Sequence, residues 1–160
     1  MTDQQQPIQQ QAEKHMAALE GWLAPFFAKA PHIPENGRRT IVDIAPWLAL
    51  IFGVLGLVSV LGAGAIASVF TLAFLGGLYD FAMFVTLAAG LCASALELLA
   101  YRPLAKREKK GWNYLFYGTV LTAAAAVVNL VVGYDSGLTG QVLGALIGLW
   151  ILFEIRGQYH

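Results

Sequence analysis

The segment that decides the fold is residues 101–112, YRPLAKREKKGW, which is the only dense run of charge in the second half of the chain. Long apolar stretches lie on both sides of it. A basic run of this kind can bind nucleic acid, bind an acidic ligand, or mark one side of a membrane. Lys and Arg in short loops mark the cytoplasmic side. We therefore interpret the run as the inner turn of a helical hairpin, and we expect no nucleic acid to bind here.

The composition supports a membrane protein. Of 160 residues, 58% are hydrophobic and only 12% are charged, whereas soluble domains carry about 25% charge. A helix needs roughly 20 apolar residues to cross the hydrocarbon core. The apolar blocks have this length, so the sequence predicts an all-α, multi-span membrane protein.

Four blocks are long enough to span. We expect a transmembrane domain at 43–160, with spans at about 44–62, 78–101, 112–134 and 138–155. Asp43 suits the start of the first helix as a capping residue. Pro103 is expected to end the second span, and Trp112 to seat the third at the interface, where Trp and Tyr prefer to lie.

The apolar piece 65–77 is too short to cross with ease, and the positions of the basic residues decide its role. If 65–77 does not cross, every basic residue near a span falls on one side. Asp80 and Asp135 then lie near the other side. We expect 65–77 to be a re-entrant or interfacial helix on the outer side, with both termini in the cytoplasm. The basic residues concerned are Arg38, Arg39, Arg102, Lys106, Arg107, Lys109, Lys110 and Arg156.

Residues 1–42 form a cytoplasmic segment, with a helix at about 8–28 and a linker at 31–42. The apolar residues of this helix recur every three or four positions, which puts them on one face. Trp22 lies at its bulkier end. We expect an amphipathic helix that lies on the membrane surface or packs on a partner or a second copy. The apolar face consists of Ile8, Ala12, Met16, Leu19, Leu23 and Phe26.

The fourth span carries a ridge of small residues. Gly140, Gly144 and Gly148 are spaced four apart and share a helix face. In membranes such ridges let two helix backbones approach closely. The partner is either a neighbouring helix of the same chain or a second copy.

Ionisable residues within spans are candidates for function. Asp80 and Glu97 lie roughly 25 Å apart by helical rise, which is too far for an acid pair. For Glu97 we expect an ion pair with Arg102, Lys106 or Arg156 rather than a proton site. For Asp80 we expect a polar contact with Asn129 of the third span.

The sequence holds no pattern typical of an enzyme or a cofactor protein. His15, His32 and His160 all lie outside the spans, and no cluster has the spacing of a metal site. Cys92 stands alone among small residues and suits helix packing. We therefore predict no catalytic, metal or cofactor site.

The segments KKGWNYLFY (109–117) and GALIGLWILFEIRGQY (144–159) resemble a group of small bacterial integral membrane proteins. The shared features are a Lys-rich turn before Gly-Trp-Asn and a last helix that ends in a Phe, Ile-Arg, Tyr pattern. The resemblance covers residues 100–160. It implies a compact four-span bacterial protein, which we therefore expect in the inner membrane, and it supplies no activity.

These observations favour a non-enzymatic scaffold or accessory subunit, in contact with lipid, that associates with itself or with a larger membrane complex. The alternative is a small oligomeric transporter or channel with Asp80 and Glu97 along its pathway. A secondary role in contacting lipid headgroups is expected for the basic turn with its tryptophan, namely Lys106, Arg107, Lys109, Lys110 and Trp112.

Overall fold

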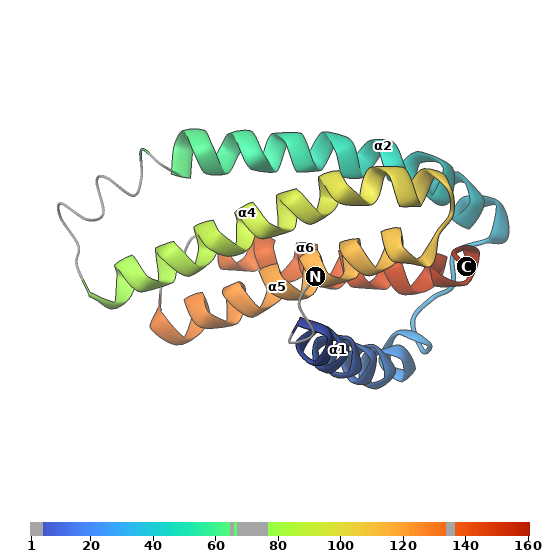
Figure 1. The fold of residues 1–160 in the computed structure, drawn as a ribbon, viewed down its shortest axis with the longest axis horizontal. Helices are drawn as coiled ribbons and strands as arrows, with labels where there is room; N and C mark the ends of the chain where they lie inside the picture. Colours follow the sequence, from blue (N-terminus) through green and yellow to red (C-terminus); the bar gives the residue numbers. More distant parts are fainter. Residues whose placement is uncertain (1–4, 65, 67–76, 134–136) are drawn as a thin grey trace. The chain divides into compact units, whose positions relative to one another are not determined.

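The structure, a computed structural model, describes residues 5–64, 66, 77–133 and 137–160. The elements within these ranges are helical, and no strand occurs in them. The chain divides into two compact units, Met1–His32 and Ile33–His160. The all-α prediction is confirmed for the described residues (Figure 1).

The first unit consists of one helix, α1 (Gln5–Phe27). Pro25 lies in its last turn, where the ring is tolerated poorly, and the helix ends two residues later. Trp22 and Phe26 are 74% and 75% exposed, and Leu19 on the same face is exposed as well. This helix therefore presents a face of large apolar side chains to its surroundings.

The second unit contains four long helices. They are α2 (Glu35–Ser59), which continues as the short π-helix η1 (Val60–Gly64), α4 (Leu78–Ala105), α5 (Lys109–Val132) and α6 (Leu138–Ile155), which is followed by a 3-10 turn, η2 (Arg156–Gln158). By length and composition, the described part of the chain has four helices apolar enough to cross a membrane.

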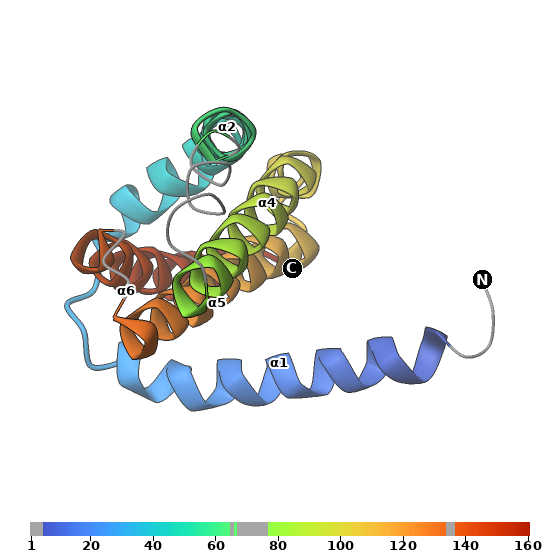
Figure 2. The same ribbon diagram turned by 90° about the vertical axis from the view of Figure 1, so that its left-hand side faces the viewer.

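The bundle is built around α4. Helices α2 and α5 both pack along α4, and α6 packs mainly on α5, so that α2 and α6 make few contacts (Figures 1 and 2). Small residues allow this packing, since Gly118 of α5 lies against Ala93 of α4. On the other face of α4, Gly56 of α2 lies against Ser94. Close approach through small residues is the usual way in which membrane helices pack.

Helix α2 begins earlier than the sequence analysis predicted. It starts at Glu35, so that most of the expected linker 31–42 is helical. Pro34 precedes the first turn, which carries Glu35 near the positive end of the helix dipole. Arg39 then pairs with Glu35 at the i,i+4 spacing that stabilises exposed helices. Asp43 consequently lies inside the helix and does not cap it.

Helix α4 does not end at Pro103, contrary to expectation, but continues to Ala105. Proline removes one N–H donor, and its ring is buried here at the helix end. The Pro103 carbonyl accepts a hydrogen bond from the Glu108 amide at 2.9 Å, so the tight turn satisfies it. The expected short helix 65–77 falls almost entirely on residues outside the described ranges.

We call the end of the bundle that contains the α4–α5 turn the basic end. The start of α2, the end of α4, the start of α5 and the end of α6 meet there. The Lys109 amide donates to the His160 carbonyl at 2.8 Å, and the His160 amide donates to the Arg107 carbonyl at 3.1 Å. Arg107 also forms an ion pair with Asp43 at 2.8 Å. The predicted clustering of basic residues at one end of the helices follows from this arrangement.

Candidate functional site

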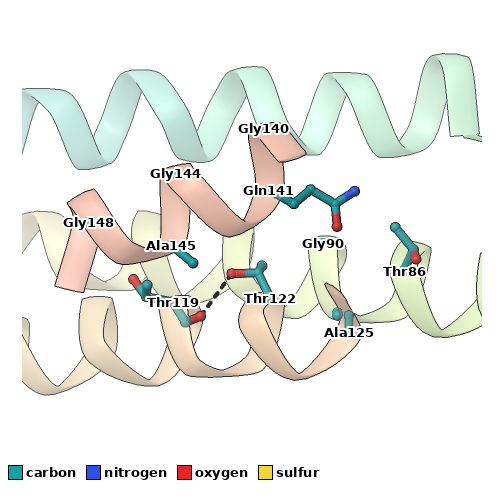
Figure 3. A pocket seen from close by; sticks show the side chains of 11 residues that line it. Thr86, Gly90, Thr119, Thr122, Ala125, Gly140, Gln141, Gly144, Ala145 and Gly148 are labelled. Atoms are coloured by element: carbon teal, nitrogen blue, oxygen red, sulfur yellow. Dashed lines mark hydrogen bonds between the residues drawn. The ribbon is translucent and has the colours of Figure 1, made fainter. Parts of the chain in front are cut away.

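A groove of about 380 Å³ opens between α4, α5 and α6 (Figure 3). Gly90 and Thr86 line it from α4, and Thr119 and Thr122 line it from α5. Its wall on α6 is formed by Gln141, Ala145 and the three glycines of the predicted ridge, Gly140, Gly144 and Gly148, which we call the glycine ridge.

The glycine ridge is uncovered over most of its length. A Cβ placed on Gly140 or Gly144 meets no atom within 4 Å, and one placed on Gly148 meets only the Thr119 methyl group at 3.7 Å. In contrast, a Cβ on Gly111 would lie 2.6 Å from the backbone nitrogen of Leu104. Thus Gly140 and Gly144 form no close helix contact with any described residue, and association with a second copy stays a prediction.

The threonine hydroxyls of the groove donate their hydrogen bonds to their own helix. Thr119 Oγ1 donates to the Leu115 carbonyl at 2.9 Å. Thr122 Oγ1 lies 3.2 Å from the Gly118 carbonyl. It also lies 3.0 Å from the Thr119 carbonyl (Figure 3). Because these donors are satisfied within α5, an apolar helix surface can cover the groove without leaving the threonine donors unpaired.

Asn129 is fully buried and binds Thr86 rather than Asp80. Its Nδ2 lies 2.9 Å from Thr86 Oγ1, and it is 0% exposed. Thr86 Oγ1 also donates to the Ala82 carbonyl at 2.9 Å. The expected contact between Asp80 and Asn129 is not formed. Within the described part of the chain, the buried Oδ1 of Asp80 has no hydrogen-bond partner.

The expected ion pair of Glu97 is also not formed among the described residues. Lys106 lies 3.9 Å from Glu108, and Arg156 lies over the Trp112 ring at 5.8 Å. The reason is helical geometry. Since α4 continues through Pro103, Arg102 and Lys106 are rotated by about 140° and 180° around the helix from Glu97.

Trp112 is buried inside the bundle, so its ring is not available to lipid headgroups, and its depth relative to a membrane stays a prediction. It is 1% exposed, and its Nε1 donates to the Leu152 carbonyl of α6 at 2.6 Å. Its ring stacks on Phe116 with centroids 5.1 Å apart and meets Phe153 edge-on. The Trp112 side chain therefore stabilises the packing of α6 on α5. The other residues of the predicted headgroup set, Lys106, Arg107, Lys109 and Lys110, are exposed.

The partners of Glu154 were not predicted from the sequence. Its side chain is 6% exposed, and its Oε1 lies 3.3 Å from Arg38 Nε. The same oxygen accepts a hydrogen bond from the Ile33 amide at 3.0 Å. The sequence did contain an indication of this ion pair, because Glu154 lies near the end of an apolar span and Arg38 lies before the first span.

Comparison with known proteins gives no family, because no family model, no curated protein and no solved structure matches the chain. Among the described residues, no group of three or more His, Cys, Asp or Glu side chains is placed to hold a metal ion. The groove and the basic end are the features of the described residues that bear on function.

Proposed function

We propose that the protein is a non-enzymatic integral membrane scaffold subunit that associates with a second copy of itself through the glycine ridge. The observation that supports this is the exposure of Gly140 and Gly144, where an added Cβ would meet no atom within 4 Å. Small-residue ridges in membranes serve helix–helix contact, and at Gly140 and Gly144 this one makes no such contact with a described residue.

The membrane location belongs to the same proposal. The four apolar helices are suited to cross a bilayer, and the positive-inside rule would place the basic end and both termini in the cytoplasm of a bacterial cell. Helix α1 is too polar to span. Its exposed face of Leu19, Trp22 and Phe26 suits either the membrane surface or the same assembly.

Native mass spectrometry in mild detergent tests the self-association. We expect the wild type to form an oligomer and Gly144→Leu to be mainly monomeric, because a leucine there separates the two backbones. Gly62→Leu is the matched control, since Gly62 is also an exposed helical glycine with no atom within 4 Å. Circular dichroism checks that all three proteins are folded. A monomeric wild type contradicts the proposal.

A second candidate is a small oligomeric transporter or channel. It is favoured by the two intramembrane carboxylates, since Asp80 Oδ1 and Glu97 have no ion-pair or hydrogen-bond partner among the described residues. A purely structural acid within a span normally has a partner. Ion flux into proteoliposomes separates the two candidates. Flux in the wild type that is lost in Asp80→Asn or Glu97→Gln, with the oligomer intact, would favour the transporter.

A further inference from the structure

A second pocket lies at the basic end, between the third and fourth turns of α2 and the last turns of α4. It has a volume of about 190 Å³, and its walls include Asp43, Trp47, Tyr101 and Arg107. Pockets for drug-sized ligands measure about 300–1,000 Å³. This one therefore fits a small chemical group rather than a whole organic ligand.

The walls combine an ion pair with two aromatic rings. Arg107 Nη2 donates to Asp43 Oδ1 at 2.8 Å, and the two side chains are 48% and 63% exposed. The rings of Trp47 and Tyr101 meet edge-on with centroids 5.7 Å apart. Trp and Tyr rings prefer the boundary between hydrocarbon and headgroups. The pocket thus offers one anion, one cation and the ring types typical of that boundary.

The ion pair leaves bonding capacity on both partners. A guanidinium has five N–H donors, and a carboxylate has about four acceptor sites. Within the described ranges, neither side chain makes a hydrogen bond other than the one that joins them. Such an exposed pair contributes only about 0–1 kcal/mol to stability. Its free donors and acceptors are available to a ligand.

The backbone holds Arg107 in a conformation that is uncommon for a residue other than glycine. Its φ is 57°, and non-glycine residues are seldom found in the left-handed region. Hydrogen bonds fix the turn on both sides, from Arg107 N to the Leu104 carbonyl at 2.9 Å and from His160 N to the Arg107 carbonyl at 3.1 Å. The guanidinium is therefore attached to a well-fixed turn.

The opposite charges of Arg107 and Asp43 restrict which kind of ligand can bind in the pocket. A simple anion bound to Arg107 would face the Asp43 carboxylate, and a simple cation bound to Asp43 would face the guanidinium. A zwitterion that carries a phosphate and a primary ammonium matches both, because guanidinium binds phosphate well and the ammonium donates hydrogen bonds to the carboxylate. The exposed ring of Trp47 adds a cation–π surface. A choline group has no N–H to donate.

We propose that this pocket binds the headgroup of phosphatidylethanolamine, with the phosphate on Arg107 and the ammonium on Asp43. The inference rests on the membrane location proposed above but not on self-association. Lipid in the leaflet at the basic end would reach the pocket beside Trp47, with its acyl chains along the apolar surface of α2.

Native mass spectrometry of the delipidated protein tests this inference. The protein is titrated with phosphatidylethanolamine, phosphatidylglycerol and phosphatidylcholine that carry the same acyl chains. We expect the wild type to prefer phosphatidylethanolamine, and Asp43→Asn and Arg107→Gln each to weaken its binding by about tenfold, as expected for the loss of one charge-assisted hydrogen bond. Arg39→Gln is the matched control, because Arg39 forms an exposed pair with Glu35 outside this pocket.

Two results would overturn the inference. One is equal or tighter binding of phosphatidylglycerol or phosphatidylcholine by the wild type. The other is unchanged binding of phosphatidylethanolamine by both pocket variants. Gly144→Leu separates this inference from the proposed function, since it should keep the lipid preference whether or not it changes the oligomeric state.

Discussion

Tyr159 places an ionisable phenol in the interior of the basic end. The residue is 5% exposed, and its hydroxyl has no hydrogen-bond partner among the described residues. Burial raises the pKa of Tyr159 to about 12, with a smaller opposing effect from Arg107 and a smaller reinforcing one from Asp43. The folded protein therefore holds this phenol in its neutral form more strongly than the unfolded chain does.

The raised pKa predicts a loss of stability at alkaline pH. Below pH 10, the ordinary pKa of tyrosine, the contribution of the neutral phenol is fully present. It is lost as the pH rises from about 10 through about 12, because the unfolded state releases the proton first. We expect Tyr159→Phe to reduce the fall in Tm over this range and to leave Tm at pH 7 unchanged or slightly higher. Thermal melts followed by circular dichroism measure this.

Tyr114→Phe is the control for the loss of one tyrosine, because the Tyr114 ring lies under the Lys110 ammonium, 5.8 Å from its centroid. An alkaline fall in Tm that is equally steep in the wild type and in Tyr159→Phe would contradict the explanation.

The surroundings of single side chains were the hardest feature to predict from the sequence. A tryptophan ring is suited both to the membrane interface and to a buried site with a hydrogen bond for its N–H. The local sequence KKGWNY favours the first, whereas Trp112 takes the second because the Leu152 carbonyl lies within reach of its Nε1. That carbonyl comes from another helix, so the outcome depends on tertiary packing.

At the scale of elements, the sequence predicted where the helices begin and end better than it predicted which face of each helix points into the bundle. Helix α6 has the bounds that we gave to the fourth span, since Gly137 precedes it and its apolar run ends at Ile155. The sequence left open whether its glycine ridge packs within the chain or on a second copy, and in the structure Gly140 and Gly144 make no close contact with a described residue. In a helix that is apolar on nearly all sides, no polar face shows which side turns inward.

A glycine packed against a neighbouring helix and an exposed helical glycine should respond in opposite ways to substitution by alanine. A methyl group on Gly111 would meet the backbone of Leu104, so Gly111→Ala should destabilise the protein by roughly 1–3 kcal/mol. Gly140→Ala meets no neighbour and should stabilise α6 in the monomer by about 0.5–1 kcal/mol through helix propensity. Unfolding titrations of both variants in detergent measure the free energies. A destabilised monomer of Gly140→Ala would mean that the ridge is covered within the chain.

For the whole molecule, the distribution of charge predicted which helix ends meet. The hydrogen bonds between Lys109 and His160, and the ion pair between Asp43 and Arg107, bring together the ends that the positive-inside rule places on one side. The partners themselves were not predictable, because a charge pattern gives the side of a residue but not the neighbour that its side chain reaches.

The same arrangement predicts the accessibility of the two ends. In a Cys92→Ser background, Lys106→Cys at the basic end and Thr139→Cys at the start of α6 should react with a membrane-impermeant maleimide from opposite sides. Both positions are exposed. In inverted membrane vesicles, only Lys106→Cys should react before detergent is added, and in intact spheroplasts only Thr139→Cys. Reaction of both from one side would contradict the proposed topology.

The contact of Glu154 with Ile33 and Arg38 has a consequence for the order of folding. Its partners lie more than a hundred positions earlier in the chain. Synthesis proceeds from the N-terminus, and local contacts such as those between α4 and α5 close sooner than distant ones. During folding, the start of α2 must therefore wait for α6, with the Arg38 charge still solvated. The carboxylate of Glu154 then completes the bundle as one of its last native contacts.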